Sequence, residues 1–207
     1  MGITLAGNQY LNIFNCYSLV NIEAEGSGIA SGCGNLVNCF NGGTINGGDS
    51  SGVIKSVSDN HTTQIINCCN LGAIECGEEW WNRLSGFVCS GYSGNLEIMN
   101  SCSIGQLIKN SGRDTRRLSY TFVYNGGLKT LDFTNCYYLQ DIVDNCKYIN
   151  ANEGTTALTD TNVQEVLDSL NNYVEEHKND YYEDYGITLV NWVIGENGYP
   201  VLDLKYE

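Results

Sequence analysis

The sequence is poor in proline, in basic residues and in long hydrophobic runs. Its 207 residues include one Pro, and ten Lys and Arg stand against 24 Asp and Glu. The scarcity of Pro excludes a collagen-like chain. Phosphate backbones and anionic lipid surfaces require clustered Lys and Arg, so we expect neither a nucleic acid nor an anionic membrane as a partner. No apolar run approaches the roughly 20 residues that span a bilayer, so direct membrane insertion is not expected.

A secretion signal is also missing, because Met1 and Gly2 lead directly into a strand-like stretch without a basic start or an apolar core. On a repetitive chain, we interpret this start as the boundary of an expressed piece of a longer protein. The expected setting is extracellular or at the cell surface, with the signal and the flanking domains outside this sequence.

In place of charge, the chain is rich in Asn, Gly and Cys, with 26, 24 and 10 copies. Hydrophobic residues make up 42% of the chain, which is enough for a folded core, while charged residues make up 16% against a usual share of about 25%. The net charge of −14 is uneven, because residues 1–150 carry −4 and residues 151–207 carry −10. This step in charge indicates two segments.

An Asn-Cys motif preceded by apolar residues recurs at 13–17, 36–40, 65–69, 99–103 and 133–137. The cysteines follow one another at steps of 23, 29, 34 and 34 residues, and Ser101 occupies the Asn position of the fourth copy. Alignment on the cysteines predicts two structural columns. The first is made of Asn15, Asn38, Asn67 and Asn135, and the second of Cys16, Cys39, Cys68, Cys102 and Cys136.

A Ser-Gly-apolar step falls between these motifs at 27–30, 51–54 and 85–88, with a degenerate copy at 120–123. Each repeat therefore holds three short apolar stretches bounded by Gly, Asn or Ser, which are typical of strands. Three strands per repeat predict one coil of a parallel β-solenoid, so residues 1–150 should form about four to five coils. Coils stack about 4.8 Å apart, which places equal positions in columns. Asn tolerates a left-handed backbone at the corners, and stacked Cys behave as small buried hydrophobes.

These repeats resemble the GLUG-type repeats of secreted and surface proteins of gut and other bacteria. The resemblance rests on the Asn-Cys-aromatic step, on the Gly-x-Ile steps at 43–45 and 72–74, and on the Ser-Gly-apolar step, over roughly residues 10–150. It implies a right-handed parallel β-helix on a cell-surface protein, adhesive in function and without an assigned activity.

Residues 151–207 depart from the repeat and predict a C-terminal cap made of an amphipathic helix and a β-hairpin. Apolar residues at helical spacing run from Val163 to Val174, and Thr161 with Gln164 forms a capping-box pattern. Two strands are predicted at 187–194 and 199–204, joined through a turn. The last coil of a solenoid exposes a strand edge and an apolar core, which such a cap would cover. A second functional domain is the alternative.

Ten cysteines raise the question of disulfides and metals. No Cys-x-x-Cys pair is present and the two histidines, His61 and His177, are isolated from cysteine in sequence, so no metal and no cofactor are expected. Column cysteines on neighbouring coils would have Cβ atoms nearly 5 Å apart, whereas a disulfide requires about 3.8 Å, so we expect them reduced and buried. A bridge stays open for one pair among Cys33, Cys69, Cys76, Cys89 and Cys146.

The third and fourth repeats are longer than the first two, through inserts at 76–83 and 110–117. Stacking would place the inserts side by side on one face, where the Arg residues of the second could meet Glu78 and Glu79 of the first. Paired Trp beside polar groups can form a sugar-stacking platform or a protein-binding hot spot. The candidate binding residues are Trp80, Trp81, Arg83, Arg113, Arg116 and Arg117. The plainer alternative is that the Trp residues fold over the solenoid and the charges pair locally.

Catalytic arrangements are not evident in the sequence. Glycoside hydrolysis needs two carboxylates at a set separation, and the acidic residues of the repeats do not recur at one column position on neighbouring coils. No Ser-His-Asp or Cys-His arrangement is visible, and a buried column cysteine is not an activated nucleophile. We therefore expect a non-catalytic surface or extracellular module, an adhesive unit or spacer that binds a glycan or a host or surface protein. The alternatives are a polysaccharide lyase or hydrolase with a β-helix fold, and a pure scaffold.

Overall fold

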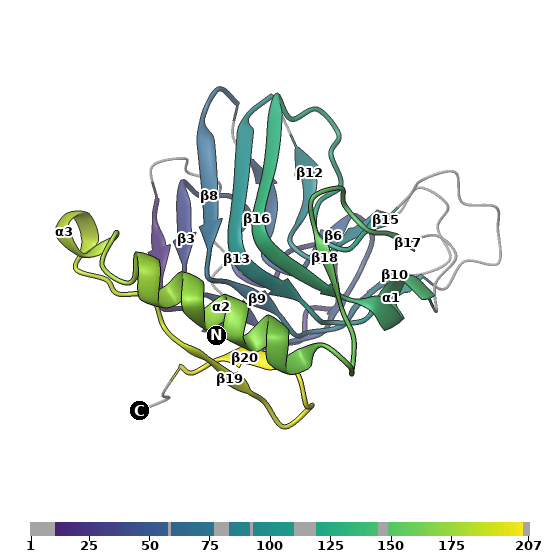
Figure 1. The fold of residues 1–207 in the computed structure, drawn as a ribbon. Helices are drawn as coiled ribbons and strands as arrows, with labels where there is room; N and C mark the ends of the chain where they lie inside the picture. The colour runs from purple at the N-terminus through teal and green to yellow at the C-terminus, as the bar shows by residue number, and fades with distance from the viewer. Residues whose placement is uncertain are drawn as a thin grey trace.

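The computed structural model describes residues 11–57, 59–76, 83–91, 93–109, 119–144 and 149–204. These residues form a mainly β structure in which strands of successive repeats pair in parallel. Figure 1 shows the sheets curling around a common interior as a half-barrel. The repeats are numbered one to five below, in the order of their Asn-Cys motifs.

The largest sheet contains nine strands and runs through all five repeats. Its strands follow the order β1-β3-β8-β13-β9-β4-β2, with β16 beside β13 and β18 beside β16, and every pair is parallel. The nine strands are β1 (Ile13–Phe14), β2 (Tyr17–Ser18), β3 (Asn35–Val37), β4 (Phe40–Asn41), β8 (Thr62–Ile66), β9 (Cys69–Asn70), β13 (Asn95–Ser103), β16 (Thr130–Leu139) and β18 (Thr156–Leu158).

Three smaller parallel sheets are formed by strands that follow the Asn-Cys motifs of repeats two to five. The first contains β5 (Ile45–Asn46), β10 (Ile74–Cys76) and β14 (Leu107–Lys109). The second contains β6 (Ser50–Ser51), β11 (Leu84–Ser85), β15 (Ser119–Tyr120) and β17 (Ile149–Asn150), and the third contains β7 (Ile54–Val57) and β12 (Val88–Gly91). A short helix, α1 (Gln140–Asp144), follows β16.

The register of the fourth repeat differs by one residue from the alignment on cysteine. Ser101 pairs with Cys136, whereas Cys102 pairs with Cys69 and Tyr137. The prediction that Cys102 stands in the same column as Cys68 was therefore wrong, and Asn100 takes the Asn position that Ser101 was expected to occupy. The buried apolar positions set the register, because Ile98 pairs with Ile65 and Phe133.

The Asn column consists of Asn15, Asn38, Asn67, Asn100 and Asn135. All five residues have a left-handed backbone, with φ of 51°, 53°, 53°, 47° and 53°. Left-handed geometry costs other side chains more than Asn, which explains why this residue recurs where each repeat bends. From Asn38 onward, each Nδ2 donates to the Oδ1 of the Asn in the preceding repeat, over 2.8, 2.8, 2.7 and 2.6 Å in chain order. The bend and the amide ladder therefore come from the same residues.

The cysteines beside the Asn column are packed into the interior as thiols. The backbone N–H of Cys39 donates to the Sγ of Cys68 over 3.4 Å, and the backbone N–H of Cys68 donates to the Oγ of Ser101 over 3.1 Å. Ser101 thus fills the place of a cysteine in this column. Free thiols occur at Cys16, Cys33, Cys39, Cys68, Cys69, Cys89, Cys102 and Cys136, while Cys146 and the side chain of Cys76 lie outside the described residues.

Close backbone approach explains the glycine of the Ser-Gly-apolar step. A Cβ atom on Gly52 would lie 2.2 Å from the carbonyl oxygen of Gly86, and one on Gly86 would lie 2.0 Å from that of Thr121. Both distances are far below a normal contact, so neighbouring repeats can approach this closely only where the side chain is hydrogen.

The C-terminal segment begins with β18, which still belongs to the large sheet, and continues with two helices and an antiparallel hairpin. The elements after β18 are α2 (Val163–His177), α3 (Tyr182–Tyr185), β19 (Trp192–Ile194) and β20 (Pro200–Leu202). The predicted capping box at the start of the helix is absent, because Asn162 is the N-cap residue and Gln164 donates to Asp168 instead. Among the described residues, no helix is long and apolar enough to cross a membrane.

This segment lies along the flank of the repeats rather than only over the last one. Figure 1 shows α2 crossing the large sheet with β19 and β20 below it. The remaining N–H groups of the Asn column donate to backbone carbonyls of the segment. The acceptors are Thr188 for Asn38 and Val190 for Asn67, both over 2.8 Å, and Leu170 for Asn100 and Ser169 for Asn135, both over 3.2 Å. Left-handed Asn residues therefore direct the segment to this side.

Apolar contacts reinforce the same placement. Val166, Leu170 and Val174 of α2 are buried in one hydrophobic cluster with Ile66 of the large sheet and with Trp192. The indole Nε1 of Trp192 donates to the Oδ1 of Asn67 over 2.6 Å, so this side chain is held by both packing and a buried hydrogen bond.

Replacement of Asn67 by Ala should destabilise the fold strongly. Asn67 donates to Asn38 and Val190 and accepts from Asn100 and Trp192, and its side chain is completely buried. Leaving these partners unsatisfied should lower the free energy of unfolding by about 3–5 kcal/mol, measured by urea denaturation. Asn60→Ala is the matched control, because Asn60 is exposed, has φ 60° and accepts one exposed hydrogen bond, from Lys129, so a loss of about 1 kcal/mol should appear. Equal losses in the two variants would contradict a role for the ladder.

The buried thiols should make stability fall above about pH 8.5. Burial raises the pKa of Cys89 and of Cys136 to about 12, and it also raises the pKa of Cys69 and Cys102. An unfolded thiol ionises near pH 8.5, so the unfolded chain binds fewer protons than the folded chain above that pH. Each such thiol should remove about 1.4 kcal/mol of stability per pH unit. Urea unfolding at pH 8, 9 and 10 in reductant measures how steeply the free energy of unfolding falls with pH. Cys89→Ala should make this fall shallower by about 1.4 kcal/mol per pH unit, the contribution of one thiol.

Candidate functional site

Of the six candidate binding residues, the structure describes Arg83. The other five, Trp80, Trp81, Arg113, Arg116 and Arg117, lie outside the described residues, as do Glu78 and Glu79, so the predicted meeting of the two inserts stays a prediction. Arg83 directly precedes β11, whose residue Leu84 pairs with Ser50 of β6. This register places Arg83 beside Asp49, one repeat earlier in the chain.

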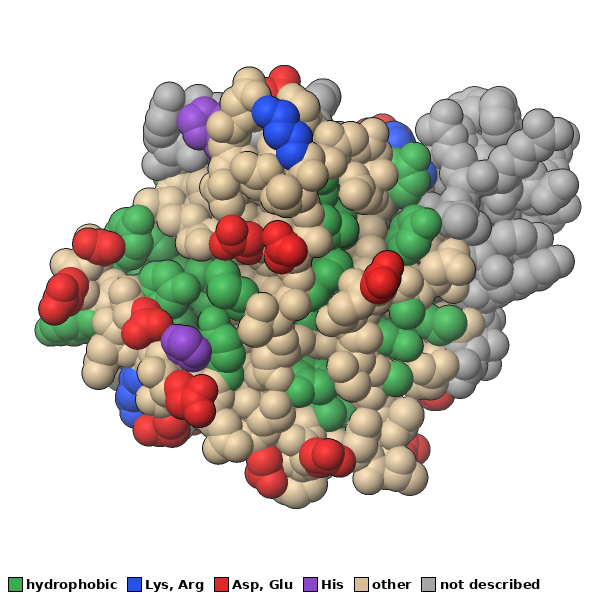
Figure 2. All heavy atoms as spheres, turned by 45° about the horizontal axis from the view of Figure 1, so that its top comes forward, with side chains coloured by type: hydrophobic (Ala, Val, Ile, Leu, Met, Phe, Trp, Pro, Cys, Tyr) green, Lys and Arg blue, Asp and Glu red, His purple; other side chains and the backbone are tan. Residues whose placement is uncertain are grey.

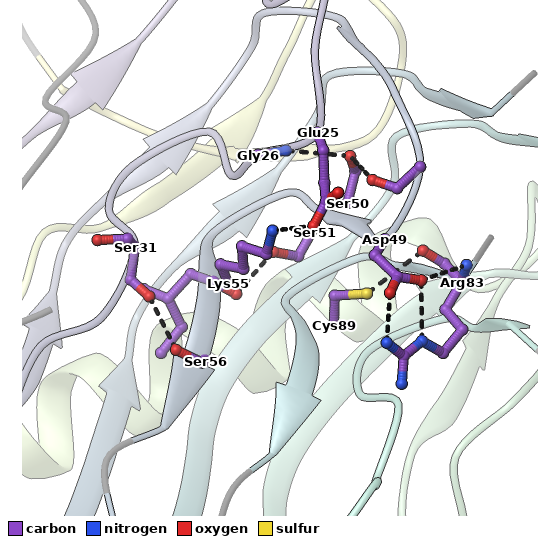
Figure 3. Close-up of polar contacts among 12 residues, drawn as sticks. Glu25, Gly26, Ser31, Asp49, Ser50, Ser51, Lys55, Ser56, Arg83 and Cys89 are labelled. Atoms are coloured by element: carbon purple, nitrogen blue, oxygen red, sulfur yellow. Dashed lines mark hydrogen bonds and ion pairs between the residues drawn. The ribbon is translucent and has the colours of Figure 1, made fainter. Parts of the chain in front are cut away.

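The carboxylate of Asp49 binds both the backbone N–H and the guanidinium of Arg83. The Oδ1 of Asp49 accepts the backbone N–H of Arg83 over 3.0 Å and the Nε–H over 2.8 Å, and its Oδ2 pairs with the Nη2. Figure 3 shows the carboxylate facing the guanidinium edge in this two-pronged arrangement. Asp49 itself has φ 36°, a left-handed geometry that Asp tolerates better than most residues. The pair is about one-fifth exposed, so water screens it only partly.

An aromatic ring completes the environment of the guanidinium. The Cζ atom of Arg83 lies 4.7 Å from the ring centroid of Tyr124, and the Tyr124 ring is 6.4 Å from that of Tyr120. Hydrogen bonding to Asp49 raises the pKa of Arg83 above its ordinary value, although burial acts in the opposite direction. A permanently charged guanidinium is therefore fixed between a carboxylate of repeat two and an aromatic ring of repeat four.

Cys89 lies next to this pair but does not have the character of a nucleophile. Its thiol donates to the backbone carbonyl of Arg83 over 3.3 Å, as Figure 3 shows. Burial raises its pKa to about 12, so the thiol is protonated at neutral pH. We refer to Asp49, Arg83, Cys89 and Tyr124 together as the Arg83 cluster.

A second ion pair lies on the same face, toward the first repeat. Lys55 pairs with Glu25 across neighbouring repeats, and both line a small pocket of about 220 Å³. Gly26 donates its backbone N–H to the Oγ of Ser50 over 3.3 Å, which connects this part of the face to the strand that follows Asp49. Glu25 is more than half exposed, so this pair is more hydrated than that of Arg83.

Two acidic residues stand at one position on neighbouring repeats, contrary to the expectation from the sequence. Glu97 of β13 pairs in register with Asp132 of β16, and Gln64 donates to the Oε2 of Glu97 over 2.8 Å. The one-residue offset of the fourth repeat concealed this alignment. Acidic side chains outnumber Lys and Arg on the face in Figure 2. Within the described ranges, however, no three Asp, Glu, His or Cys side chains are grouped so that they could hold a metal ion.

Sequence reasoning identified Arg83 but did not single out its partner Asp49. A signal was present, because Asp49 precedes Ser51 by the same two residues that separate Arg83 from Ser85. Alignment on the Ser-Gly step therefore places the two charges on neighbouring repeats. Tyr124 carries no comparable signal, because its step at 120–123 is degenerate.

No protein-family model matches the chain, and no curated protein matches it. A crystal structure from Bacteroides ovatus, named as a "putative immunoglobulin A1 protease", is similar over 98% of this chain, with 15% sequence identity and a TM-score of 0.49. This chain spans 66% of the length of that one. At this identity and TM-score, the likeness assigns neither a fold nor an activity to the chain.

Removal of the Asp49 carboxylate should destabilise the fold more than removal of Glu25. In Asp49→Ala the largely buried Arg83 charge loses its bidentate partner, which should lower the free energy of unfolding by about 2–3 kcal/mol. Glu25→Ala removes an exposed partner, and its effect should stay within about 0.5 kcal/mol. Chemical denaturation of both variants checks the order, and a larger loss for Glu25→Ala would contradict it.

Proposed function

We propose that the chain is a non-catalytic repeat module of a cell-surface or extracellular protein, which acts as an adhesive unit or spacer. Its repeats form a right-handed parallel β-solenoid of about four to five coils over residues 1–150, closed by the segment 151–207. Support comes from the parallel register that aligns equivalent positions of successive repeats, and from the amide ladder that runs through five of them. The GLUG-type resemblance of the sequence agrees with this proposal.

The observation that carries the binding role is the fixed guanidinium of Arg83 at the base of the first insert. Asp49 and Tyr124 hold this side chain from neighbouring repeats, so Arg83 itself is a fixed point at the end of the insert. Binding residues need such support, because a mobile anchor loses entropy when a ligand is bound. Trp80 and Trp81 stand three and two residues before this anchor in sequence. We assign to them the contact with a glycan or a surface protein, together with Arg113, Arg116 and Arg117.

A polysaccharide-active enzyme is the second candidate, and the paired acids Glu97 and Asp132 are the observation in its favour. Retaining and inverting glycosidases both require two carboxylates flanking one bond. In this chain Gln64 already occupies one oxygen of Glu97, and the thiol of Cys89 is protonated. We therefore favour the non-catalytic function.

A glycan array and a panel of surface proteins test the binding face. The parent chain should bind a ligand, and the double variant Trp80→Ala, Trp81→Ala should bind it at least tenfold more weakly, because the aromatic stacking surface is lost. Tyr182→Ala is the matched control, since Tyr182 is an exposed aromatic residue on α3. Retained binding in the double variant, or the absence of binding by the parent, would exclude this face as the site.

Incubation with polysaccharides separates the two candidate functions. The parent chain should release no reducing ends and no unsaturated products from a panel of acidic and neutral polysaccharides. If the parent does release products, and Glu97→Gln and Asp132→Asn abolish their release while the Trp variant does not, the enzyme is the correct assignment.

A further inference from the structure

The Asn column has a direction. Each Asn donates to the carboxamide oxygen of the preceding repeat, from Asn135 to Asn100 and onward to Asn38 and Asn15. A ladder of this kind ends in an amide oxygen at one side and in amide N–H groups at the other. Asn135 supplies the acceptor end and Asn15 supplies the donor end.

The acceptor end is closed within the chain. The Oδ1 of Asn135 accepts from the hydroxyl of Tyr137 over 2.6 Å and from the hydroxyl of Ser169 over 2.8 Å. These two hydroxyls occupy the place that the N–H of a sixth Asn would take. The ladder therefore cannot continue beyond repeat five without displacing them.

The donor end is open in the part of the chain that the structure describes. The Nδ2 of Asn15 donates no hydrogen bond there, whereas every other column Nδ2 donates two. Asn15 shares the left-handed backbone of the column, with φ 51°, and its side chain is exposed. Hydrogen bonds in series polarise one another, so the terminal N–H of such a ladder is a better donor than an isolated amide.

A pocket of about 430 Å³ lies beside this open end. Asn15 contributes to its wall, together with the backbone-rich stretch that follows α3 and with the last described residues of the chain. Its lining residues are Asn15, Tyr17, Gly186, Ile187, Thr188, Val190, Asp203 and Leu204. The pocket thus offers an amide donor and the carboxylate of Asp203 as an acceptor, between apolar walls.

We propose that this pocket binds a carboxamide group carried by a polypeptide, most simply an Asn side chain that adds one step to the column. A carboxamide presents an acceptor for Asn15 and a donor for Asp203 on one planar group. The ladder shows that one carboxamide is the natural partner of the next. A second copy of this chain cannot extend the column end to end, because the oxygen of Asn135 at the acceptor end is already occupied by Tyr137 and Ser169.

The test uses the full chain and a synthetic acetylated peptide with the sequence of residues 35–40, which carries one column Asn. Titration is followed by the side-chain amide resonances of Asn15 in a ¹H–¹⁵N spectrum. The peptide should shift these resonances in a saturable way, and the same peptide with Leu in place of that Asn should bind at least tenfold more weakly. Equal binding of the two peptides, or no binding, would overturn the proposal.

Variants of the chain provide the second arm. Asn15→Asp keeps the oxygen that accepts from Asn38 but removes both N–H donors, and it should bind the peptide at least tenfold more weakly by calorimetry. Asn125→Asp is the matched control and should bind as the parent does, because Asn125 is exposed and uses only its oxygen, toward Gly127 and Leu128. Equal binding by Asn15→Asp and the parent contradicts the site. If Asn15→Asp unfolds, the comparison of the two peptides on the parent chain decides.

Free propanamide distinguishes a polypeptide ligand from a small amide. It should shift the Asn15 resonances only at concentrations at least tenfold above those needed for the peptide. Saturation by propanamide at the peptide's concentration would overturn the polypeptide part of the proposal.

Discussion

The left-handed asparagine is the constraint on which the rest of this structure depends. A positive φ turns the chain at the same point of each repeat and directs the side-chain amide along the column. Gly would permit the turn but has no amide, and an ionised Asp has no N–H to donate. Only Asn supplies the bend, a donor and an acceptor together. The bend of each repeat, the amide ladder and the attachment of the covering segment depend on this combination.

The amide ladder also explains how so many polar groups are buried in a chain with few charges. Asn38, Asn67 and Asn100 are completely buried, and each satisfies both N–H groups and its oxygen. The covering segment supplies the carbonyls that the repeats themselves lack, and it contributes α2 and Trp192 to the apolar cluster on that flank. Burial of the ladder and attachment of the segment are therefore energetically coupled, because the outer N–H groups of the column and the carbonyls of the segment would be buried without hydrogen bonds if either were absent.

Local patterns in the sequence predicted the parallel strands, the bend at Asn and the helix and hairpin near the C-terminus. The position of that helix and hairpin was not predictable from the sequence. It depends on amide donors that are lined up on one flank only after the repeats have stacked. Alignment on cysteine misplaced Asn100, since the column beside it accepts Ser101 as readily as a thiol. The same offset hid the pairing of Glu97 with Asp132, and Asp49 was overlooked because its partner lies 34 residues away.

The bonds between the Asn column and residues 188–192 join positions that are 123 to 152 residues apart. Ribosomes release the chain from its N-terminus, so the five repeats can pair with one another before their covering segment has been made. Until then, the outer amides of the growing repeats are bonded to water alone. We expect closure of the flank to be slower than the pairing of neighbouring repeats, because it must join such distant parts of the chain.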